Sequence, residues 1–181
     1  MVKINLFFLL IAGFSFSQQN TARIKEIDAM VIEIEELESI QETPGVISSY
    51  IEKVRDTTII EDNREYVRSF VAKKCQYSTS DFSTLVLCDF PQDDPCYGPC
   101  TCFYFKDNKL FYVTSGFGDG GYSDYTYIYY NSLEKPFKFL YKSIEDYQDE
   151  KVMDITDQDE QKEILIEIQA SLNQILRILN Q

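Results

Sequence analysis

The sequence predicts an α+β fold: an antiparallel β-meander of about seven strands flanked by an N-terminal and a C-terminal amphipathic helix. Residues 100–142 hold four runs rich in Phe, Tyr, Val, Ile and Thr, separated by Asp107-Asn108, residues 116–121 and residues 131–136. Such runs, bounded by Asn, Asp, Gly and Pro, are typical of strands joined by turns. Near both ends of the chain, apolar residues instead recur every three or four positions, as on one face of a helix.

The first hairpin of the meander is predicted to turn at Asp107-Asn108, because both residues tolerate the positive φ of a two-residue turn. This turn would pair Phe105 with Leu110 and Phe103 with Tyr112 on one face of the sheet. The opposite face would carry Cys102, Tyr104, Phe111 and Val113. Both faces are therefore apolar or aromatic, which is not typical of a sheet with one open, solvated face.

Three further strands are expected earlier in the chain, at residues 49–60, 64–76 and 84–90. Residues 91–99 are rich in proline and have no periodicity, so they are expected to form a loop. After the meander, residues 145–154 are interpreted as a polar, acidic connector.

The N-terminal helix is predicted over residues 20–41, and the C-terminal helix is predicted to begin near Asp157, where Glu160 completes a capping arrangement. The apolar stripe of the second helix is expected to cover one sheet face. A coiled-coil seam with the first helix, or with a second molecule, is the alternative. The two stripes comprise Ile24, Ile27, Val31 and Ile34, and Leu165, Ile168, Leu172, Ile175 and Leu179.

Residues 1–17 are predicted to be a cleaved signal peptide. A basic start at residues 1–3 precedes an apolar run at residues 4–14 and the small-residue cleavage signal Ser15-Phe16-Ser17. The run is shorter than the roughly 20 apolar residues that span a bilayer. The expectation is therefore a bacterial protein exported to the periplasm or the extracellular space, with residues 18–181 as a single domain.

Charge and composition narrow the function classes. The formal charge of −13 would become −14 on loss of Lys3 with the leader, and such an acidic chain is repelled by nucleic acid and by anionic lipid. The chain has no histidine, which excludes the usual Ser-His-Asp and Cys-His mechanisms and imidazole zinc sites. The sequence implies no cofactor, no metal and no catalytic residue.

The five cysteines are expected to form disulfides, because the chain is predicted to enter an oxidising compartment. Cys75 and Cys88 are placed symmetrically about Asp81-Phe82, so a hairpin turning there would set them side by side. Cys96 would then pair with Cys100 or Cys102, leaving one cysteine over. A thiolate metal site from these last three cysteines is the rival, but its C-x3-C-x-C spacing matches no common zinc pattern.

The glycine-rich residues 116–121 are interpreted as a hairpin connection. They resemble a phosphate-binding loop only superficially, because no Lys and no helix follow. Asp119, Asp124 and loop carbonyls are a weak calcium candidate, since their spacing fits no defined calcium loop.

The candidate binding residues are Tyr125, Tyr127 and Tyr129, which alternate onto one strand face, with Asp119 at the rim. Such a ladder is either core packing or, if left uncovered, a binding surface. The predicted function is a non-catalytic binding module of the inhibitor, immunity or envelope-accessory kind, with a protein or a small ligand as partner. The alternatives are a carboxylate-based hydrolase without histidine and a structural oligomer held by its helices, including a homodimer through a helix or the odd cysteine.

Overall fold

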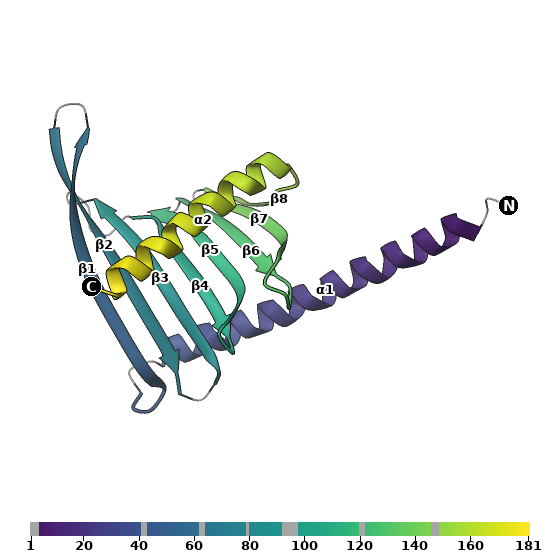
Figure 1. Cartoon of the computed structure of the whole chain (residues 1–181), viewed down its shortest axis with the longest axis horizontal. Coiled ribbons are helices and arrows are strands. Elements are labelled where there is room, and N and C mark those ends of the chain that lie inside the picture. Colours follow the sequence, from purple (N-terminus) through teal and green to yellow (C-terminus); the bar gives the residue numbers. More distant parts are fainter. Residues whose placement is uncertain are drawn as a thin grey trace. The chain divides into compact units, whose positions relative to one another are not determined.

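The computed structural model describes residues 4–40, 43–61, 64–78, 80–91, 98–119, 122–145 and 149–181. Over these residues the predicted α+β meander is confirmed, with eight antiparallel strands whose order in the sheet follows the chain (Figure 1). The elements are α1 (Ile4–Ser39), β1 (Ile47–Glu61), β2 (Arg64–Tyr77), β3 (Phe82–Pro91), β4 (Cys100–Lys106), β5 (Lys109–Asp119), β6 (Tyr122–Tyr130), β7 (Pro136–Glu145), β8 (Asp149–Asp154) and α2 (Gln158–Leu179).

The chain divides into two compact units, residues 1–39 and residues 40–181. The first unit is α1, which begins at Ile4 rather than near residue 20 and so runs through most of the predicted leader. The Leu and Ala of the leader favour a helix, and its Ile and Phe are readily accommodated in one. Cleavage of the leader stays a prediction. Among the described residues, no helix is both long and apolar enough to cross a membrane.

The hairpin between β4 and β5 turns where it was predicted to turn, with positive φ at Asp107 (52°) and Asn108 (61°). Phe105 pairs with Leu110 as expected, but the register then shifts. The predicted pairing of Phe103 with Tyr112 is wrong, because a β-bulge places one extra residue, Phe111, on β5. Tyr104 consequently pairs with Tyr112, and Phe103 with Val113, so the two tyrosines share a face.

The predicted connector at residues 145–154 instead contains β8, which forms one edge of the sheet. Its only apolar residues are Val152 and Met153, and both are exposed. A short, charged edge strand has no buried face to give it an alternating pattern, and this explains why the sequence did not predict it.

Helix α2 covers one face of the sheet, which confirms the predicted docking (Figure 1). The Asp157 side chain caps the helix by accepting hydrogen bonds from the backbone N–H groups of Asp159 and Glu160, both at 2.9 Å. The core of this layer unites residues of α2 with residues of six consecutive strands, among them Ile168, Ile175, Ile178, Ala72, Leu87, Phe103, Val113, Ile128 and Phe139. The side of the sheet that carries these residues is called the α2 face below.

Candidate functional site

The candidate site is the opposite side of the sheet, called the tyrosine face below. Successive residues of a strand point to opposite faces. Because Phe103, Val113 and Ile128 lie in the core beneath α2, the residues that follow or precede them, such as Tyr104 and Tyr112, point away from it. Within residues 40–181, α2 is the helix described, and it packs on the other face.

Strand pairing arranges the tyrosine face in three rows that cross the sheet. Directly paired residues share a face, so each row is read from one strand to the next. The first row is Val54, Val71, Cys88, Cys100, Gly116, Tyr125, Lys142 and Val152. The second is Glu52, Lys73, Val86, Cys102, Thr114, Tyr127, Leu140 and Asp154. The third is Tyr50, Cys75, Thr84, Tyr104, Tyr112, Tyr129 and Lys138.

Five of these tyrosines contact one another and form the tyrosine ladder: Tyr104, Tyr112, Tyr125, Tyr127 and Tyr129. Tyr112 is its centre, with ring centroids 5.4 Å from Tyr104 and 5.0 Å from Tyr129. The ring of Tyr127 lies 6.2 Å from those of Tyr112 and Tyr125. These separations fall within the range of favourable aromatic pairs, so each ring holds its neighbour in place.

The ladder has a buried part and a partly accessible part. Tyr112 and Tyr129 are 5 % and 6 % exposed, whereas Tyr125 and Tyr127 are only half-buried. The three tyrosines predicted as binding residues therefore do share one face. The sequence missed Tyr104 and Tyr112, because their common face depends on the bulge in β5.

The position of Tyr125 depends on Gly116, its partner on β5. A Cβ at Gly116 would lie 2.1 Å from the carbonyl oxygen of Asp124 and 2.5 Å from Cδ1 of Tyr125. Only glycine leaves room for the Tyr125 ring to lie over β5. The predicted loop at residues 116–121 is thus wrong over its first four residues, since residues 116–119 belong to β5.

Burial, followed by the nearby Tyr129 and Tyr127 hydroxyls, raises the pKa of Tyr112. We expect the folded protein to lose stability as the pH rises above about 10, the pKa of an unfolded tyrosine, because the folded state keeps Tyr112 protonated. Below about pH 10 the contribution of Tyr112 to the stability of the folded protein is fully present. At pH 11 the free energy of unfolding should be about 1.4 kcal/mol lower because of Tyr112 alone.

Urea denaturation at pH 8 and pH 11 measures this loss. Tyr112→Phe should lose about 1.4 kcal/mol less between the two pH values than the wild type does. Equal losses in the two proteins would show that Tyr112 titrates normally in the folded state.

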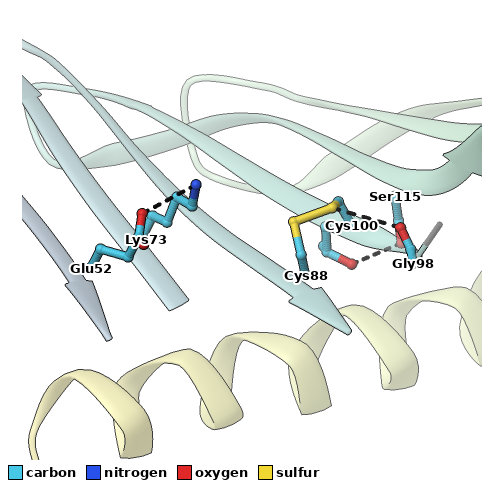
Figure 2. Close-up of a disulfide and its surroundings, with 7 residues drawn as sticks. Glu52, Lys73, Cys88, Gly98, Cys100 and Ser115 are labelled. Carbon is cyan, nitrogen blue, oxygen red and sulfur yellow. Dashed lines mark hydrogen bonds and ion pairs between the residues drawn. A yellow bond between two sulfur atoms is a disulfide. The ribbon is translucent and has the colours of Figure 1, made fainter. Parts of the chain in front are cut away.

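Lysines at the edges of the tyrosine face are paired with acids. Lys138 lies 2.6 Å from Asp154, and Lys142 lies 3.1 Å from Glu150, both on β8. At the other edge, Lys73 lies 3.2 Å from Glu52 (Figure 2). These exposed pairs contribute little stability, but they compensate the positive charge on this face.

The disulfide in the described part of the chain joins Cys88 and Cys100, with their Cα atoms 4.1 Å apart (Figure 2). The two residues are direct partners on β3 and β4 in the first row of the tyrosine face. The predicted Cys75–Cys88 bridge is wrong, because the β2–β3 hairpin pairs Gln76 with Ser83 and so turns before Asp81-Phe82. Cys75 consequently pairs with Thr84, four residues from Cys88 along β3 and about 13 Å away.

The structure describes only some of the residues on which the remaining cysteine predictions depend. Cys96 lies outside the described residues. Its predicted pairing with Cys100 is wrong, because Cys100 is bonded to Cys88, and the alternative pairing with Cys102 stays a prediction. Cys102 lies opposite Val86 and Thr114 in the second row. Among the residues that the structure describes, no group of three or more Cys, Asp, Glu or His side chains is placed to hold a metal ion.

Of the two acidic residues singled out in the sequence, Asp119 and Asp124, the structure places only the side chain of Asp124. The side chain of Asp119 lies outside the described part of the structure. Asp124 lies on the α2 face, where its carboxylate accepts hydrogen bonds from the hydroxyls of Tyr122 and Tyr141. In both tyrosines this hydrogen bond is the main cause of a raised pKa, which for Tyr122 reaches about 12. Asp124 is therefore not part of the tyrosine face.

Comparison with known proteins gives no further guide. No family model matches the chain, and no curated protein and no solved structure shows a significant similarity to it.

Proposed function

We propose that this chain is a small exported protein that acts as a non-catalytic binding module, with the tyrosine face as its binding surface. The observation that carries the proposal is the tyrosine ladder, which lies on the side of the sheet away from α2 and ends in the half-buried Tyr125 and Tyr127. The partner is a protein or a small ligand. Inhibitor, immunity and envelope-accessory roles belong to this class.

Tyrosine suits such a surface for physical reasons. Its ring offers a large apolar area, its hydroxyl tolerates water, and it has few rotatable bonds to order on binding. In the ladder, contacts with Tyr112 hold the ring of Tyr127 in place before a partner arrives. A surface ordered in advance loses less entropy when it binds.

Charge supports a partner with a basic surface. The chain carries 30 acidic and 17 basic residues, and the lysines at both edges of the tyrosine face are paired with acids. A basic partner would be steered toward this protein, whereas an acidic one would be repelled.

The test is partner capture from the envelope fraction of the source cells. We expect Tyr127→Ala to weaken binding of the captured partner by about thirtyfold, the effect of losing an anchoring tyrosine worth about 2 kcal/mol. Tyr122→Ala is the matched control, because Tyr122 is an exposed tyrosine of the same strand on the α2 face. Wild-type affinity in both Tyr125→Ala and Tyr127→Ala would rule out the tyrosine face as the binding surface.

A further inference from the structure

The two edges of the sheet differ in a way that points to self-association. The edge strand β8 has six residues and is mainly charged. The other edge strand, β1, has 15 residues and exposes Val54 and Ile60 to 60 % and 69 %. Proteins usually protect sheet edges by shortness and charge. Strand β8 has both, whereas β1 carries charged residues but is long. We propose that β1 pairs antiparallel with β1 of a second copy of this chain, giving a symmetric dimer.

Part of β1 also lacks support from its own sheet. Strand β3 pairs with β2 from Gln76 only as far as Arg68, the partner of Thr57. Beyond that point, residues 58–61 and 64–67 form a ribbon of two strands that projects from the sheet (Figure 1). A ribbon of two strands is marginally stable alone, so a further strand along β1 would stabilise it.

Symmetry restricts how two β1 strands can pair. Edge-to-edge antiparallel pairing requires a two-fold axis perpendicular to the sheet, so that one residue of β1 lies opposite its own copy. Centres at Glu52, Lys53, Arg55 or Asp56 each place a charged residue opposite itself. A centre at Val54 places Lys53 opposite Arg55. Like charges directly opposite one another are destabilising, so all five registers are disfavoured.

The register centred on Thr57 has none of these conflicts. Thr57 would lie opposite its own copy, and the exposed Val54 would lie opposite the exposed Ile60 twice, once on each side of the axis. Centres such as Tyr50, Ile51 and Thr58 also avoid like charges within β1, but only a centre at Thr57 places Val54 opposite Ile60. The dimer centred on Thr57 is therefore the one that β1 favours, and it does not depend on the proposed function.

Disulfide crosslinking tests the register. Paired Cα atoms in antiparallel strands lie about 4.5–5.5 Å apart, within reach of a disulfide, so oxidised Thr57→Cys should form covalent dimers. In Arg55→Cys, the two introduced cysteines would lie about 14 Å apart and should not crosslink. Wild-type protein, run in parallel, gives the background from the native cysteines. Crosslinking of Arg55→Cys but not of Thr57→Cys would contradict the register.

Charged substitutions at Val54 and Ile60 test whether the dimer forms. Sedimentation should find a dimer for the wild type. A Val54→Lys, Ile60→Lys variant should dissociate about tenfold or more readily, because each lysine faces another lysine. A Val54→Glu, Ile60→Glu variant should behave likewise, and mixing the two should restore dimers.

Val152→Lys is the matched control, because Val152 is an exposed valine on the other edge strand and should leave the dimer intact. Unchanged melting temperatures would show that all variants fold. A wild type that stays monomeric, or a dimer that both charge variants leave intact, would overturn the proposal.

Discussion

Replacing Ile175 by alanine is expected to lower the free energy of unfolding by about 2–5 kcal/mol, the usual range for a buried isoleucine in a core. Ile175 is 0 % exposed and lies in the middle of the layer between α2 and the sheet. Its removal leaves a cavity that neither the helix nor the sheet can easily fill. Leu172→Ala should have an effect toward the lower end of that range, because Leu172 is only partly buried.

Ile166→Ala is the matched control, since Ile166 is 63 % exposed on the same helix. Its effect should stay within about 0.5 kcal/mol. Chemical denaturation monitored by circular dichroism measures all three variants. Equal losses for Ile175→Ala and Ile166→Ala would mean that α2 does not dock through the buried side.

Removing the Cys88–Cys100 disulfide with two serine substitutions should cost about 3 kcal/mol. The bond closes a loop that spans 12 positions, so it restricts the unfolded chain, and it ties β3 to β4 next to the tyrosine ladder. Denaturation with and without a reducing agent measures the effect. The reductant should weaken the wild type more than it weakens the double variant. A wild type insensitive to full reduction would contradict a stabilising role.

Much of the fold could be predicted because local signals agree with the final structure. The Asp107-Asn108 turn, the Asp157 cap and the apolar stripe of α2 each act over a few residues, and each was confirmed. Strand β8 was missed for the opposite reason. It exists because β7 offers it a partner, and nothing in its own composition marks it as a strand.

The candidate site was only partly predictable, because register decides which side chains meet. The alternation of Tyr125, Tyr127 and Tyr129 is visible in the sequence, and their shared face followed from it. Tyr104 and Tyr112 join the tyrosine ladder only because of a one-residue bulge in β5, which no sequence signal marked. The disulfide was predicted between the wrong cysteines for the same reason. A shift of the β2–β3 turn by two residues changes which residues of the two strands lie opposite each other.

The central claim is that the accessible end of the tyrosine ladder serves binding rather than stability, and the melting temperature of Tyr127→Ala tests it most directly. We predict a drop of no more than about 4 °C, because Tyr127 is only half-buried at the accessible end of the ladder. Tyr112→Ala, which removes the buried centre of the ladder, should lower the melting temperature by about 10 °C. An equally large drop for Tyr127→Ala would place that tyrosine in the core and contradict the account.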